Sequence, residues 1–160
     1  MSKIKNYEEI GKIAYRLRFF GEKIVTTNGG FDILHCAHLN LFEKAKKEGN
    51  KLIVLLNSDD SIKRFKGDSR PIVNQNERAY MLSGFSCVDY VSIFNEDKPL
   101  RLLEIIKPHI HVKGGSYIEE RIKEERETLE KWDGKLKLFE LEEGHSTTDI
   151  INKILERYKN

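Results

Sequence analysis

The chain has 160 residues and a formal net charge of +2, and 39% of its residues are hydrophobic and 34% charged. We expect residues 1–160 to form a single domain with a substantial core, in which residues 1–20 carry a helix that precedes the first strand. So mild a charge argues against a nucleic-acid-binding protein. The sequence has two cysteines, no signal-peptide core and no apolar run near the roughly 20 residues that span a bilayer, so it predicts a cytoplasmic protein without a membrane partner.

Hydrophobic periodicity predicts helices and strands that alternate along the chain. In chain order these are a helix at 7–19, a strand at 23–27, a helix at 38–48, a strand at 51–57, a loop at 58–74, a helix at 75–85, a strand at 88–94, a helix at 99–106, a strand at 109–113, a helix at 117–132, a strand at 135–141 and a helix at 147–158. Short β-branched runs separated by helices favour an α/β fold with a parallel sheet that is covered on both faces.

The loops that follow these strands contain every unusual cluster of residues in the chain. In a parallel α/β sheet, ligands bind outside the carboxyl ends of the strands. The loops at those ends cover residues 28–35, 58–74, 95–98, 114–117 and 142–146. We therefore expect one ligand site that is built from several of these loops.

The loop after the first strand predicts a phosphate site. Residues 27–38 have the sequence TNGGFDILHCAH, a glycine turn that leads into a helix with His35 and His38 at its start. A helix N-terminus attracts an anion, glycines let the backbone approach it, and imidazoles can donate hydrogen bonds to phosphate oxygens. The alternatives are a metal site, for which no third ligand stands nearby in the sequence, and a purely structural role. His109 and His111 lie on a strand pattern, where one of them is expected to be structural.

Two further loops carry groups that suit phosphates. Lys63 and Lys66 lie in a cationic, glycine-containing loop that could neutralise a polyphosphate, or that is an ordinary solvated surface loop. Ser146, Thr147 and Thr148 precede the last helix, where hydroxyls and amides form either a second phosphate cradle or a plain N-cap.

The remaining features are less specific. Lys113 precedes a Gly-Gly pair at 114–115, which permits close approach of a flat or charged group or forms a simple turn. Arg78 could clamp an acceptor phosphate, or pair with Glu77 or another carboxylate. Residues 119–132 have mixed charges at helical spacing, and we assign them no chemistry.

Taken together, these loops resemble those of one family. The sequence is similar to the cytidylyltransferase-type nucleotidyltransferases, whose His-x-Gly-His signature is His35-Cys36-Ala37-His38 here. Residues 27–29, 31–35, 66–71, 112–115 and 146–148 resemble the adenylyltransferase domain of bacterial D-glycero-β-D-manno-heptose 1-phosphate enzymes, here in a stand-alone form. The resemblance implies a Rossmann-like α/β fold with a five-stranded, mainly parallel sheet between helices, and a homodimer.

The same resemblance implies that a sugar-phosphate oxygen attacks the α-phosphorus of ATP and releases pyrophosphate, with Mg²⁺ or another divalent cation on the phosphates. It implies catalytic roles for His35, His38 and Lys66 and names no residue that holds the metal. The residues that it places on the nucleotide are Thr27, Asn28, Gly29, Gly30, Phe31, Lys63, Lys113, Gly114, Gly115, Ser146, Thr147 and Thr148. The residues that it places on the acceptor are Asp32, Arg78, Ser116 and Tyr117.

Three residues depart from the family pattern: Ala37 replaces the signature glycine, Gly30 stands for a larger residue, and Ser116 replaces an aspartate. Ala37 would impair a backbone that needs positive φ, but it suits a helix. Two other functions stay open. One is a CTP-dependent cytidylyltransferase for glycerol 3-phosphate or another phospho-alcohol, and the other is a nucleotide-binding module without turnover.

Overall fold

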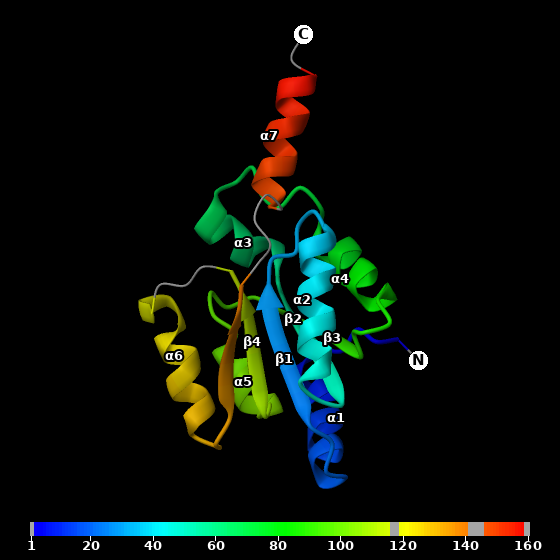
Figure 1. The fold of residues 1–160 in the computed structure, drawn as a ribbon, viewed down its shortest axis with the longest axis vertical. Coiled ribbons are helices and arrows are strands. Elements are labelled where there is room, and N and C mark those ends of the chain that lie inside the picture. Colours follow the sequence, from blue (N-terminus) through cyan, green and yellow to red (C-terminus); the bar gives the residue numbers. More distant parts are fainter. Residues whose placement is uncertain (1, 116–118, 141–145, 159–160) are drawn as a thin grey trace.

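The computed structural model describes residues 2–115, 119–140 and 146–158, and its centre is a five-stranded sheet (Figure 1). The strands are β1 (Ile24–Gly29), β2 (Lys51–Asn57), β3 (Tyr90–Phe94), β4 (Ile110–Gly114) and β5 (Lys135–Phe139). Their order is β3-β2-β1-β4-β5, and every neighbouring pair is parallel. The predicted α/β fold is therefore confirmed, and the described sheet is parallel throughout.

Seven helices are described: α1 (Tyr7–Phe19), α2 (Cys36–Lys47), α3 (Asp59–Lys66), α4 (Gln75–Gly84), α5 (Leu100–Ile106), α6 (Glu119–Glu130) and α7 (Thr147–Arg157). Two apolar clusters hold the layers together. One joins α2 and α4 to one face of the sheet, and the other joins α1, α5 and α6 to the opposite face. Along each strand the side chains alternate between these two clusters, as the pleat requires.

Local sequence signals explain where α1 begins and ends. The Asn6 side chain accepts a hydrogen bond from the Glu9 amide while the Glu9 carboxylate accepts one from the Asn6 amide, which is a capping box. Ile10 and Ala14, four positions apart, are both fully buried. Gly21 follows the helix with a φ of 73°, a conformation that glycine adopts without strain.

The structure corrects the expectation of a loop throughout residues 58–74, because α3 occupies the first half of that segment. Ser58 caps this short helix, its first turn is acidic and its last turn is basic, so charges complement the helix dipole at both ends. Of its side chains only Ser61 and Ile62 are buried, so the apolar periodicity that predicts a helix is missing. Elsewhere α2 begins at Cys36 rather than at residue 38, α1 and β2 have the expected bounds, and the other described boundaries differ by one or two residues.

The order of the strands creates a switch point at the carboxyl ends of β1 and β4. The chain connects β1 to β2 on one side, whereas β4 is added on the other side of β1 after α5. Such a point leaves a crevice in which α/β proteins bind ligands. Figure 1 shows α3 and the start of α7 above this edge, while the rest of α7 extends away from the sheet. No helix among the described residues is long and apolar enough to cross a membrane.

Candidate active site

The loop between β1 and α2 is shaped by Phe31, which has a positive φ of 44°. Its ring is buried and packs edge-on against Phe42 and His38, at centroid distances of 5.1 and 5.2 Å. A Cβ at Gly29 would lie 2.9 Å from this ring, and one at Gly30 would lie 3.1 Å from the Ile62 side chain. The tight loop therefore requires Gly29 for internal packing. The Phe31 side chain points into the core, so a nucleotide could contact this residue only through its backbone.

His35 and His38 lie together at the start of α2, as the signature predicts. Their rings are stacked with centroids 3.7 Å apart, and His35 is the N-cap residue, with no side-chain hydrogen bond to the helix amides. The first turn of α2 contains no acidic residue, so its positive end is open to an anion. Burial, together with the charges of His35 and Lys66, lowers the pKa of His38 to about 4. At neutral pH His38 is an uncharged imidazole that can donate one hydrogen bond.

Ala37 lies within α2 and is buried, and its φ is not positive. The signature position is thus helical in this chain, and alanine meets no backbone strain there. The sequence left open whether Ala37 strains the backbone or suits a helix, and the structure favours the helix.

Lys66, at the end of α3, lies near His38, and Arg70 in the loop after α3 lies near Lys66. Loss of solvent and the charge of Arg70 lower the pKa of Lys66, although Asp32 opposes the shift. Lys66 in turn lowers the pKa of His38, which places the two groups near each other. Lys63 and Lys66 are both exposed on α3, so only part of the Lys66 side chain is shielded from water. The structure thus brings Lys66 to the histidines and adds Arg70, which the sequence analysis did not single out.

Asp32 is buried beneath these cations, and its carboxylate is already paired with donors of the protein. Its carboxylate accepts hydrogen bonds from Arg70 Nε at 2.6 Å and from the amides of Ile72 and Val73 at 2.8 and 2.9 Å. Burial acts to raise the pKa of Asp32, but these donors outweigh it and hold the pKa below its usual value. Only 5% of the residue is exposed. This geometry corrects the expected acceptor contact, since Asp32 orients Arg70 and its loop instead.

The structure also corrects the expected role of Arg78 as a clamp for the acceptor. It is 1% exposed, and its guanidinium donates to the carbonyls of Val73, Gly30 and Asn57 at 2.8, 2.6 and 2.9 Å. A further N–H donates to Asp59 Oδ1 at 2.6 Å, which is the ion-pair alternative with a carboxylate other than Glu77. Four of its five N–H donors are thereby used inside the protein. Arg78 therefore ties three segments of the chain together, and its guanidinium is used by acceptors within the protein.

Three buried polar atoms around this loop find no hydrogen-bond partner among the described residues: Thr27 Oγ1, His38 Nδ1 and Arg70 Nη2. Buried polar groups are nearly always paired, so unpaired ones are a feature that needs an explanation. They belong to the end of β1, to α2 and to the loop after α3. A polar ligand at this edge of the sheet would supply what they lack.

On the other face of the sheet, the ends of β1 and β4 are joined by Lys113. Its ammonium donates to Asn28 Oδ1 and to Glu125 Oε1, each at 2.8 Å. The positive charge of Lys113 is paired with a buried carboxylate, that of Glu125. Glu125 and His111, which also contacts Asn28, were missed because one lies in a helix with mixed charges and the other in a strand pattern.

The last helix begins beside the first loop. Ser146 caps α7 through a hydrogen bond from the Asp149 amide, and Thr147 Oγ1 donates to the Ile33 carbonyl at 3.4 Å. Thr148 is exposed. The predicted second cradle thus lies next to the histidine loop, although capping accounts for Ser146. At the end of β4, Gly114 closes the strand and Gly115 has a φ of 125°, whereas Ser116 and Tyr117 lie outside the described residues.

Among the described residues, no group of three His, Cys, Asp or Glu side chains could hold a metal ion. The histidine pair therefore does not resemble a protein-held metal site. The predicted Mg²⁺ remains a prediction, and the chain's described residues fit it only as an ion that is carried by phosphates.

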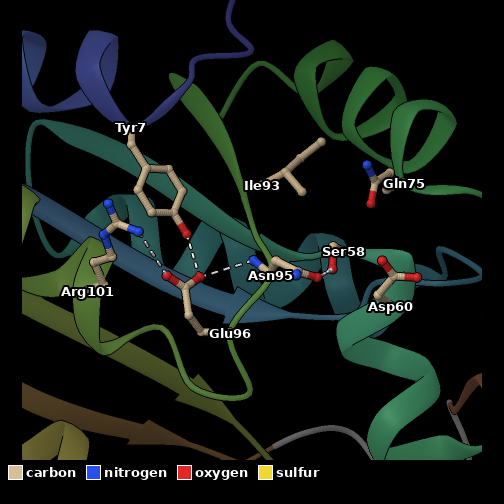
Figure 2. Close-up of a pocket in the computed structure, with 8 residues that line it drawn as sticks. All are labelled: Tyr7, Ser58, Asp60, Gln75, Ile93, Asn95, Glu96 and Arg101. Atoms are coloured by element: carbon tan, nitrogen blue, oxygen red, sulfur yellow. Dashed lines mark hydrogen bonds and ion pairs between the residues drawn. The ribbon is translucent and has the colours of Figure 1, made fainter.

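A separate pocket of about 590 Å³ lies between α1 and the carboxyl end of β3 (Figure 2). Tyr7 Oη donates to Glu96 Oε2 and Ser58 Oγ donates to Asn95 Oδ1, each at 2.6 Å, and the guanidinium of Arg101 lies 5.0 Å from the Tyr7 ring centre. These groups satisfy one another, and the lining residues include none that the sequence predicted for the nucleotide. The candidate site is therefore defined by its unpaired polar groups rather than by this hollow.

Comparisons with known proteins find one family over most of the chain. A family model described as cytidylyltransferase-like matches residues 26–153. The bifunctional protein HldE of Aliarcobacter butzleri is 47% identical over 158 residues, which are 99% of this chain and 32% of that protein. The bifunctional protein HldE of Pelobacter propionicus is 44% identical over 157 residues, or 98% of this chain and 32% of that protein. The chain thus spans about a third of the length of these relatives.

Solved structures show the same fold. A lipopolysaccharide core biosynthesis protein from Thermoplasma volcanium superposes with a TM-score of 0.62 and 27% identity, over 76% of this chain and 98% of that one. A pantoate-beta-alanine ligase from Francisella tularensis gives a TM-score of 0.64 at 17% identity, over 98% and 78% of the two chains. The second likeness shows the fold alone.

Proposed function

Because this chain belongs to the cytidylyltransferase-like family of nucleotidyltransferases, we propose that it transfers the adenylyl group of ATP to a sugar 1-phosphate, with D-glycero-β-D-manno-heptose 1-phosphate as the acceptor. The products would be ADP-heptose and pyrophosphate. The resemblance of residues 66–71, 112–115 and 146–148 to heptose 1-phosphate adenylyltransferase domains supports this acceptor.

One observation supports the proposal most directly. The open N-terminus of α2 lies beside a stacked histidine pair and close to buried donors that lack partners, and these are the groups that a triphosphate needs. No nucleophilic side chain is required if the acceptor oxygen attacks the α-phosphorus directly. Catalysis would then consist of positioning and of stabilising the charge that develops on the phosphate oxygens.

The described residues differ in their proposed roles according to their charge. His38, neutral before the nucleotide binds, donates from its imidazole to a phosphate oxygen, and His35 supports it by stacking. Lys66 and Arg70 neutralise negative charge, and Arg70 is held by Asp32 for this purpose. A divalent cation would supply further charge neutralisation on the triphosphate. The start of α7, with Thr147 against the first loop, closes the phosphate site on a second side.

The proposal is tested by pyrophosphate release from each of four nucleoside triphosphates against a panel of phosphosugars and phospho-alcohols. We expect turnover with ATP and the heptose 1-phosphate. Activity with only CTP and glycerol 3-phosphate would contradict the heptose assignment in favour of a cytidylyltransferase. Binding of ATP in a calorimeter without turnover on any acceptor would favour a non-catalytic nucleotide-binding module.

The predicted homodimer is part of this proposal. Phe19 and Phe20, at the end of α1, are 75% and 72% exposed, which suits the contact role expected for this helix. Analytical ultracentrifugation at micromolar protein would reveal it, and a monomer under those conditions would contradict it.

A further inference from the structure

A network of buried polar side chains joins β1, β4 and α6 beneath the carboxyl edge of the sheet. His111 is fully buried in β4, with Thr26 Oγ1 2.7 Å from its Nδ1 and Asn28 Oδ1 3.2 Å from its Nε2. Lys113 Nζ lies 2.8 Å from the same Asn28 oxygen and 2.8 Å from Glu125 Oε1. Glu125 is 2% exposed. Of the four strand residues in this network, Thr26 and His111 are buried, whereas Asn28 and Lys113 are half-buried. The half-buried pair lies at the edge where the nucleotide is proposed to bind.

The register of the sheet explains why these groups meet. Thr26 stands opposite His111 in the parallel pair β1–β4. Asn28 and Lys113 each lie two positions further along their strands, so they project from the same face. That face is covered by α6, which brings Glu125 onto it. The arrangement is a property of the tertiary structure rather than of any one segment.

The chemistry of the partners determines how the Asn28 amide is oriented. An ammonium group can only donate, so the atom that Lys113 approaches must be the carbonyl oxygen of Asn28. The same oxygen requires a hydrogen on His111 Nε2, which leaves Nδ1 to accept from the Thr26 hydroxyl. Burial and the charge of Lys113 lower the pKa of His111 well below its usual value, consistent with a neutral ring. The Asn28 NH₂ group is consequently turned away from the network, and no described residue accepts a hydrogen bond from it.

The network is costly for a protein that needs only a stable core. A buried ion pair and a buried imidazole must be desolvated, and well-packed apolar side chains of similar size often give equal or greater stability. In register, His111 stands between Thr26 of β1 and Leu136 of β5, and neither of these residues is charged. What the network provides, and an apolar core does not, is a single fixed orientation of the Asn28 amide.

We propose that His111 and Glu125 are positioning residues that hold Asn28 as a hydrogen-bond donor to the bound nucleoside triphosphate. Lys113 links Glu125 to Asn28 through its two hydrogen bonds, and it is not itself a free cation that binds a phosphate. This inference rests on the proposed function, because it takes ATP as the ligand of this edge.

The test is a double-mutant cycle on the dissociation constant of Mg-ATP, measured by calorimetry on the full chain. His111→Leu removes both ring contacts and Asn28→Ala removes the donor. We expect each to weaken ATP binding roughly three- to ten-fold, the range for one neutral hydrogen bond. The two effects should not add, because His111 acts through Asn28. His111→Gln, which can donate to Asn28 and accept from Thr26, should restore binding to within about two-fold of the wild type.

Two matched controls separate positioning from general loss of stability. His109 lies exposed at the amino end of the β4 region, and His109→Leu should leave ATP binding unchanged. Glu124 lies next to Glu125 on α6 but pairs with Lys98 on the surface. Glu125→Ala should weaken ATP binding, whereas Glu124→Ala should not. Thermal unfolding of each variant identifies any that fails to fold, and His111→Gln keeps the test available in that case.

Additive effects of His111→Leu and Asn28→Ala, or unchanged ATP binding in both, would overturn the inference while leaving the proposed function intact. ATP binding with a coupled cycle, but no pyrophosphate release with any acceptor, would support the network and contradict the proposed reaction. Failure of the wild-type chain to bind any nucleoside triphosphate would contradict both.

Discussion

Replacement of Arg78 tests whether this residue holds the site together or touches substrate. Its side chain is fully buried and donates to three backbone carbonyls and to the Asp59 carboxylate. Arg78→Ala would leave all four acceptors without their donor and open a cavity between the three segments. Arg78→Lys keeps the charge, but a single ammonium cannot reproduce the planar fork that reaches acceptors on separate segments.

The expected magnitude follows from the burial of the two partners. Removing one partner of a buried ion pair costs roughly 3 to 5 kcal/mol. The Asp59 side chain is 29% exposed, so water can reach it and the ion-pair contribution falls toward the lower end. The three carbonyls and the cavity act in the opposite direction. We therefore expect Arg78→Ala to lower the free energy of unfolding by about 3 to 5 kcal/mol, and Arg78→Lys by about half of that.

Urea unfolding followed by circular dichroism measures this change. Arg64→Ala is the control, because Arg64 pairs with Asp97 on the surface and its loss should cost less than about 1 kcal/mol. The reasoning would be refuted if Arg78→Ala changed the unfolding free energy by less than about 1 kcal/mol and at the same time raised the KM for the sugar phosphate about ten-fold. That result would restore the acceptor contact that the sequence alone suggested.

Four further predictions concern Gly29, Asp32 and His38, which lie between the end of β1 and the first turn of α2. His38→Ala should lower kcat by about 100-fold or more, since one lost transition-state donor costs roughly 3 kcal/mol; unchanged kcat would remove His38 from the mechanism. Since folding lowers its pKa from 6.5 to about 4, the unfolded chain binds more protons between these values, and His38 destabilises the fold as pH falls from 6.5 to 4. The cost is at most about 3 kcal/mol and less for a part-exposed ring, so His38→Ala should unfold with a weaker dependence on pH in this window. Asp32 has the opposite linkage: its lowered pKa stabilises the fold above the unfolded value of about 3.9, and this stability is lost below it. Asp32→Asn should therefore lower stability and ATP turnover at neutral pH, because Arg70 loses its anchor, and should lose less stability than the wild type on acidification; equal acid profiles would contradict the pairing. Gly29→Ala puts a Cβ 2.9 Å from the Phe31 ring and should cost about 1 to 3 kcal/mol in thermal or urea unfolding, against no change for an alanine at the open Gly84.

Most of the secondary structure was predictable because it depends on patterns among residues that are adjacent in the sequence. Buried apolar runs such as β2 and capped amphipathic helices such as α1 are recognisable from adjacent residues. The short helix α3 was not predictable in this way, since it buries only two side chains and depends on its cap and terminal charges. The structure and the family match confirm the α/β fold and the nucleotidyltransferase family.

The site shows a similar division. The stacking of His35 and His38 follows from a motif that places the two residues three positions apart at one helix start. The expected proximity of Lys66 to this pair is also seen. The roles of Asp32 and Arg78 do not, because a charged residue near a predicted ligand loop can face either the ligand or the protein. Here both face the protein, and they hold loops that are distant in the sequence.

By itself the sequence determined the order of the strands and of the described helices other than α3, the family, and the loop that leads to the histidine pair, since each depends on residues close together in the chain. Only the tertiary structure decided which charges are free and which are paired. Asp32 with Arg70, Arg78 with Asp59, and Lys113 with Glu125 are separated by 38, 19 and 12 positions. Whether such groups pair depends on which strands are neighbours and which helix covers which face. That is determined by burial of the whole core rather than by local propensity.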